Sequence, residues 1–136
     1  MELIHTGRKK ESFARYYKRN FGKLEGRWTP VINAMLALMI RLEAEVQGEP
    51  LYGSTSHTTV VFRRPDLTDG FVCWFTYGLT FINGEGGRGN VSAYFIQDFS
   101  RTIHRAETVD EAVEIIAVLV RQCENRHSQL DTNESS

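Results

Sequence analysis

Residues 71–82, FVCWFTYGLTFI, decide the fold. Aromatic and β-branched residues dominate this stretch, and both favour strands over helices. Successive side chains of a strand point to opposite faces, so the odd-numbered residues from Phe71 to Phe81 share one apolar, aromatic-rich face. The even-numbered residues place Trp74 beside Thr76 on the other face. We therefore expect the first face to line the core and the second to lie outside it.

Two further strands are predicted beside this one. Residues 57–64 are rich in β-branched side chains, and residues 91–105 continue the alternation. Turn-forming residues 65–70 and the glycine-rich segment 83–90 join the three strands, and short connections make antiparallel neighbours. The sequence thus predicts a three-stranded antiparallel β-meander. The inward residues of the two flanking strands are then Val60, Phe62, Val91, Ala93, Phe95, Phe99 and Ile103, and the outward residues include Val61, Arg63, Tyr94, Ile96 and His104.

Two helices are expected before the sheet. Phe13, Tyr17 and Phe21 recur at four-residue spacing, which predicts a helix over residues 8–21 with an aromatic stripe. The second helix starts at Thr29, a good N-cap residue that is followed by proline at the first helical position. Apolar residues cover most of its circumference, so this helix is expected to be central.

A last helix follows the sheet. Thr108 and Glu111 have the spacing of a capping box, and we expect the helix to end near Arg126. The predicted fold is therefore α+β, in the order α-α-β-β-β-α. It forms one domain over residues 1–126, with a flexible tail at 127–136.

Composition narrows the class of protein. No apolar run approaches the roughly 20 residues that a membrane-spanning helix needs. The cysteines, Cys73 and Cys123, form no CxxC pair, and the histidines have no metal-ligand spacing. We expect a cytoplasmic protein with reduced thiols, no membrane contact, no metal and no cofactor.

Two sequence features suggest a catalytic site, and neither meets the requirements of one. Cys73 with His57 or His104 would suggest a thiol nucleophile, but Cys73 falls on the predicted core face and His104 on the opposite one. The glycine-rich segment 84–90 resembles a phosphate loop, yet it joins two strands, whereas phosphate loops lead into a helix. We therefore expect a protein that is not an enzyme.

The outward face of the sheet supplies the leading functional hypothesis. Trp74 and Tyr94 are predicted to lie on it with Arg63, and Trp, Tyr and Arg are enriched in protein interfaces. With Arg88 at the tip of the glycine-rich segment, these residues predict a surface for a macromolecular partner, as in an inhibitor or adaptor protein. Two alternatives are that the first helix covers this face and that a homodimer forms through it.

Charge supplies a second hypothesis. Residues 1–28 carry eight basic and three acidic side chains, a net charge of +5, which leaves −6 for residues 29–136 of a chain with net charge −1. Clustered cations neutralise phosphates, and aromatic rings stack on bases. Nucleic-acid binding through the first helix is therefore the alternative function. Its candidate residues are Lys9, Lys10, Arg15, Lys18 and Arg19.

Overall fold

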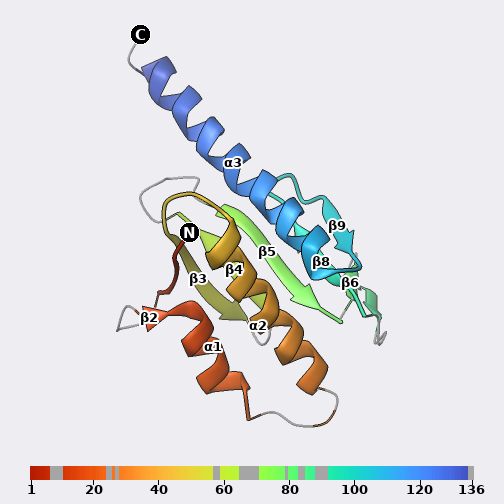
Figure 1. Ribbon diagram of the computed structural model, residues 1–136. Coiled ribbons are helices and arrows are strands. Elements are labelled where there is room, and N and C mark those ends of the chain that lie inside the picture. The colour runs from red at the N-terminus through yellow and green to blue at the C-terminus, as the bar shows by residue number, and fades with distance from the viewer. Residues whose placement is uncertain are drawn as a thin grey trace.

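The computed structural model describes residues 1–6, 11–23, 26, 28–56, 59–64, 71–78, 80–82, 85–87 and 92–134. Within these ranges the chain folds into three helices and nine strands (Figure 1). The helices are α1 (Phe13–Phe21), α2 (Trp28–Glu45) and α3 (Val109–Glu134). The strands are β1 (Leu3–His5), β2 (Glu11–Ser12), β3 (Leu51–Ser56), β4 (Thr59–Arg63), β5 (Phe71–Tyr77), β6 (Thr80–Ile82), β7 (Glu85–Gly87), β8 (Tyr94–Gln97) and β9 (Ile103–Ala106).

Seven of the described strands form one mixed sheet in the order β2-β1-β3-β4-β5-β8-β9. Strands β1 and β3 are parallel, and every other neighbouring pair is antiparallel. The remaining two strands, β6 and β7, pair with each other as a separate hairpin. The α+β class is confirmed, but the predicted three-stranded meander is wrong because the sheet is larger and mixed.

The prediction missed the strands at the start of the sheet. Strand β1 has only three residues, and its parallel partner β3 lies more than forty residues later in the sequence. A local sequence pattern does not predict a pair between segments so far apart. Strand β3 is also hard to recognise, because it contains Gly53 and several hydroxyl-bearing residues. The helix predicted over residues 8–21 begins only at Phe13, because Glu11 and Ser12 pair with β1.

The predicted third strand, residues 91–105, is two strands joined by a turn. Strand β8 ends at Gln97 and β9 starts at Ile103. Between them Arg101 has a φ of 67°, a left-handed conformation that breaks the strand. The predicted second strand ends early in the same way, at Gly78 with a φ of 80°.

All three helices lie on one side of the large sheet (Figure 1). The ring of Phe13 in α1 meets the ring of Phe62 in β4 at 5.8 Å. The hydroxyl of Tyr94 in β8 donates to the carbonyl of Ala34 in α2 at 2.7 Å. The idea that α1 covers the outward face is therefore wrong, because α1 packs on the same side as α2.

The core between helices and sheet contains Leu3, Phe13, Tyr17, Met35, Leu38, Met39, Leu42, Val60, Phe62, Cys73, Phe75, Ile96, Ile116 and Val120.

The last helix starts where the sequence predicts. The Oγ1 of Thr108 accepts a hydrogen bond from the Glu111 amide at 3.2 Å, so Thr108 is the N-cap. The prediction that the helix ends near Arg126 is wrong, because α3 continues to Glu134 and its C-terminal half extends past the sheet (Figure 1). Whether residues 127–136 are flexible stays a prediction.

No helix in the described ranges is both long and apolar enough to cross a bilayer.

Candidate functional site

The side of the sheet opposite the helices, here called the helix-free face, is organised in rows that cross the strands. Residues directly opposite each other in an antiparallel pair share a face. One row crosses five strands and consists of Ser54, Val61, Trp74, Gln97 and Ile103. All five are at least partly exposed. At about 4.8 Å between strands, the row spans about 19 Å.

Two further rows flank this middle row. On one side, Tyr52 and Phe71 lie on either side of Arg63. On the other side, Phe95 lies between Thr76 and Arg105. The helix-free face thus mixes apolar, hydroxyl-bearing and arginine side chains.

Part of the third row is covered. Thr76 is 4% exposed and Phe95 is 3% exposed, and the hydroxyl of Thr76 makes no hydrogen bond to the described part of the chain. The accessible area of the helix-free face is therefore centred on the middle row and on the row of Arg63.

Trp74 is held in place by its own hydrogen bonds. Its indole Nε1 donates to the Oε1 of Gln97 on the adjacent strand. The Nε2 of Gln97 in turn donates to the carbonyl of Arg101 at 3.4 Å. With the N–H satisfied inside the chain, the ring is held in one orientation and stays partly exposed.

The β8–β9 turn that supplies this carbonyl is fixed by Asp98. Its Oδ1 accepts hydrogen bonds from the amide and hydroxyl of Ser100, both at 2.9 Å, and from the amide of Thr102 at 3.0 Å. Its Oδ2 lies 2.9 Å from the Nε2 of His104. Burial acts to raise the pKa of Asp98, but the hydrogen bonds from His104, Ser100 and Thr102 together hold it below the ordinary value.

Arginines surround the middle row. Arg63 and Arg101 are exposed and make no ion pair within the described ranges, and the exposed Arg105 binds Glu107 at 2.6 Å. On the helical side, Arg41 binds both Glu45 and Asp110. Among the described residues, Arg63 and Arg101 therefore bring positive charge to the neighbourhood of the middle row that no described carboxylate pairs with.

The placement of Trp74 and Arg63 on the outward face is confirmed, and that of Tyr94 is wrong. Tyr94 is 4% exposed and points to α2, and burial raises its pKa to about 12, with a smaller contribution from Tyr77. Register explains the error, since Tyr94 pairs with Tyr77 and Phe95 with Thr76. Alternation shows which residues share a face, and only the register shows which face it is.

A β-bulge produced a second misassignment. The pairing of β4 with β5 shifts between Phe62 and Arg63, so Cys73 lies opposite Phe62 but Phe71 lies opposite Arg63. The skipped residue, Val72, joins the core at 1% exposure. The predicted inward Phe71 and outward Val72 have therefore exchanged faces.

The basic residues of α1 are only partly available. Arg15, Lys18 and Arg19 are exposed, but Arg19 forms two hydrogen bonds to Glu11, at 2.6 and 2.8 Å. The rings of Phe13 and Tyr17 are fully buried and offer no surface to nucleic-acid bases. Three other predicted contact residues lie outside the described ranges, namely Lys9, Lys10 and Arg88.

Among the described residues, Cys73 and His104 make no hydrogen bond to each other. Cys73 is fully buried, and burial raises the pKa of its thiol, so the reactive thiolate is disfavoured. Asp98 binds both Ser100 and His104, whereas in a hydrolase triad the histidine lies between the other two. His57 lies outside the described ranges. No cluster of three potential metal ligands occurs among the residues described.

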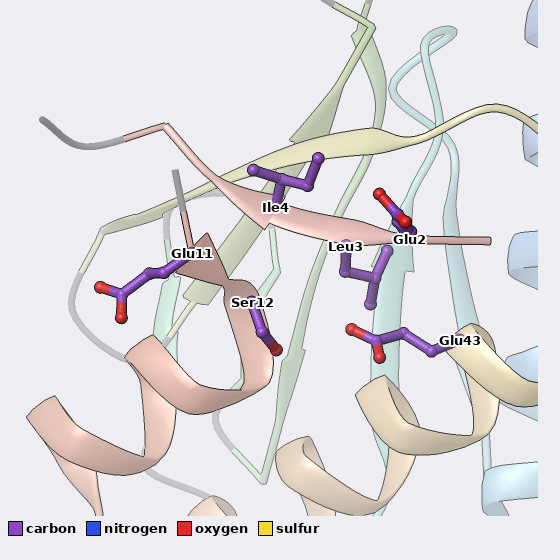
Figure 2. A pocket seen from close by; sticks show the side chains of 6 residues that line it. All are labelled: Glu2, Leu3, Ile4, Glu11, Ser12 and Glu43. Carbon is purple, nitrogen blue, oxygen red and sulfur yellow. The ribbon is translucent and has the colours of Figure 1, made fainter. Parts of the chain in front are cut away.

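A separate cleft of about 380 Å³ opens at the β1–β2 edge, lined by Glu2, Leu3, Ile4, Glu11, Ser12 and Glu43 (Figure 2). Burial raises the pKa of Glu43. Figure 2 shows the Glu11 carboxylate pointing away from those of Glu2 and Glu43, toward the opposite side of the view. The three carboxylates therefore do not converge on one ligand position.

Comparison with protein families, with curated proteins and with solved structures gave no match for this chain. Its function must be argued from its own geometry.

Sequence reasoning missed four residues of the helix-free face: Gln97, Arg101, Ile103 and Arg105. Gln97 and Arg105 carry no motif, and their position depends on the register of β8 and on the turn at Asp98. The sequence does contain one signal for this turn, because Asp98, Ser100 and Thr102 are all residue types that favour turns.

Proposed function

We propose that this chain is a non-enzymatic binding protein that acts on a protein partner through its helix-free face. One observation carries the proposal: a partly exposed row with Val61, Trp74 and Ile103 crosses the centre of a sheet face that no described helix covers. Exposed apolar surface of this kind is typical of interaction sites.

Trp74 has the properties of an interface anchor. Its hydrogen bond to Gln97 fixes the ring before binding, so little side-chain entropy is lost when a partner packs on it. Ser54 and Gln97 add polar groups in the same row, and Arg63 lies in the next row. A central aromatic residue with a polar and charged rim is the usual anatomy of a protein interface.

Affinity capture with variants of the full chain tests the proposal. Trp74→Ala and Val61→Glu each change the middle row, whereas Ile40→Glu places the same charge on α2, where Ile40 is 60% exposed. We expect the wild type and Ile40→Glu to capture a common set of proteins that both row variants fail to capture. The circular dichroism of all three variants should equal that of the wild type. Capture that is equal for all four proteins would refute the proposed surface.

Nucleic-acid binding through α1 is the second candidate, and the exposed side chains of Arg15 and Lys18 favour it. It requires affinity that falls steeply with salt, since phosphate neutralisation releases counterions. A gel shift with single- and double-stranded probes at low and physiological salt tests it, with the double variant Arg15→Glu/Lys18→Glu as comparison. Equal mobility of the probe with wild type and variant removes this candidate.

A further inference from the structure

The charged side chains of the helix-free face identify the kind of partner. Within the described strands, the ionisable side chains of the three rows, apart from tyrosine, are those of Arg63 and Arg105. Arg101 adds a third cation at the turn beside Gln97. Of the described carboxylates near these arginines, Glu107 is engaged by Arg105 and Asp98 by its own turn.

The start of α3 has the opposite character. Residues 29–136 sum to a charge of −6, yet the described rows of the helix-free face contain Arg63 and Arg105 and no carboxylate. Exposed acidic residues gather at the start of α3, namely Asp110, Glu111 and Glu114. Among the described residues, the rows of the helix-free face and the start of α3 therefore differ in charge, which favours one orientation of a charged partner.

We infer that the helix-free face binds an acidic protein segment, with carboxylates of the partner on Arg63 and Arg101 and an apolar side chain of the partner on Trp74. The inference rests on the proposed function and adds the chemistry of the partner. Arginine suits this role because its guanidinium binds a carboxylate through two parallel hydrogen bonds.

The same observations favour a protein over a nucleic acid on this face. Nucleic-acid sites need many cations, and the described part of this face offers three, Arg63, Arg101 and Arg105. The middle row places aliphatic Val61 and Ile103 on either side of the strands that bear Trp74 and Gln97, and aliphatic side chains complement apolar protein side chains. The indole N–H of Trp74 is already donated to Gln97 and is not available to a base.

Selection from a random library of displayed 16-residue peptides on the immobilised full chain tests the inference. We expect the enriched peptides to combine Asp and Glu with apolar residues and to be richer in acidic residues than the starting library. Synthetic copies should bind Arg63→Glu at least about 30-fold more weakly than wild type, as for truncated interfacial charge pairs. Arg121→Glu makes the same charge change at an exposed position on α3 and should bind as wild type does.

The outcomes separate this inference from the proposed function. Some peptides could need Trp74 but bind Arg63→Glu and Arg101→Glu as well as wild type. That result would refute the acidic partner and would still support the helix-free face as the binding surface. Peptides that bind Trp74→Ala normally, or no enrichment at all, would overturn both. A 16-nucleotide single-stranded DNA or RNA that binds the same face more tightly than any peptide would assign the face to nucleic acid and refute the inference. A Lys-for-Glu change in the peptide that restores binding to Arg63→Glu would establish the direct pair.

Discussion

Trp74 illustrates how one residue on this face depends on groups distant in the sequence. Its indole is fixed by Gln97, and Gln97 is fixed by the carbonyl of Arg101 in a turn that Asp98 holds. Sequence alternation alone placed Trp74 on the outward face. It did not place Gln97 there, because the strand that carries Gln97 is aligned by register, which local pattern does not encode.

Asp98 yields a pH-dependent prediction. Its pKa in the folded protein is below the ordinary value of 3.8, so the ionised form stabilises the fold. This contribution is complete above about pH 5 and is lost as the pH falls through the folded-state pKa. Urea unfolding at pH 7 should show Asp98→Asn less stable than wild type by about 1.5–3 kcal/mol, the usual value for hydrogen bonds to charged groups.

The same two proteins provide the control for that prediction. Titration of the other carboxylates is common to both, so the gap between their unfolding free energies isolates Asp98. The gap should narrow between pH 5 and pH 2.5. A gap that stays constant over this range would mean that the Asp98 charge contributes nothing to the fold.

Strand β3 and helix α1 fit together at a glycine. A Cβ added to Gly53 would lie 2.5 Å from two ring carbons of Phe13, which is itself fully buried. Gly53→Ala should therefore lower the free energy of unfolding by about 1–3 kcal/mol, as overpacking does. Thermal or urea unfolding measures the change.

The neighbouring residue offers a matched comparison. Ser54 points to the helix-free face and is exposed, so Ser54→Ala should stay within about 0.5 kcal/mol of wild type. Equal stability of the Gly53 and Ser54 variants would contradict the close packing of α1 on β3.

Helix α3 begins at the N-cap residue that the sequence predicts, Thr108. Thr108→Ala removes the acceptor of the Glu111 amide and should cost about 1 kcal/mol in unfolding free energy, whereas Thr108→Ser keeps the hydroxyl and should cost only a few tenths. Unfolding followed by far-ultraviolet circular dichroism measures both. If the alanine and serine variants are equally stable, the hydroxyl does not cap the helix.

At the level of elements, the sequence predicted what is encoded locally. The starts of α2 and α3 depend on neighbouring residues: α3 begins after its predicted cap Thr108, whereas α2 begins at Trp28, so the predicted cap Thr29 lies inside the helix. The core positions of β4 and of Cys73 and Phe75 in β5 follow from simple alternation. The strands β1 and β3 were missed, and Tyr94 was placed on the wrong face, because both depend on pairing between distant segments.

At the level of the whole molecule, all described helices share one side of the sheet (Figure 1). The register places Arg63 and Arg105 in the rows of the other side. This two-sided arrangement explains how a chain with net charge −1 presents a local positive surface. Composition did not identify the face, because Arg63 and Arg105 belong to residues 29–136, whose summed charge is −6.

Hydroxyl-radical footprinting of the full chain, with and without a peptide selected on it, tests the binding face most directly. Oxidation of Trp74 and Val61 should fall when the peptide binds, while Ile40 and Val118, exposed on the helical side, should be oxidised as before. Unchanged oxidation of Trp74 and Val61, with protection of Ile40 or Val118 instead, would show that the partner binds the helices and would contradict the account.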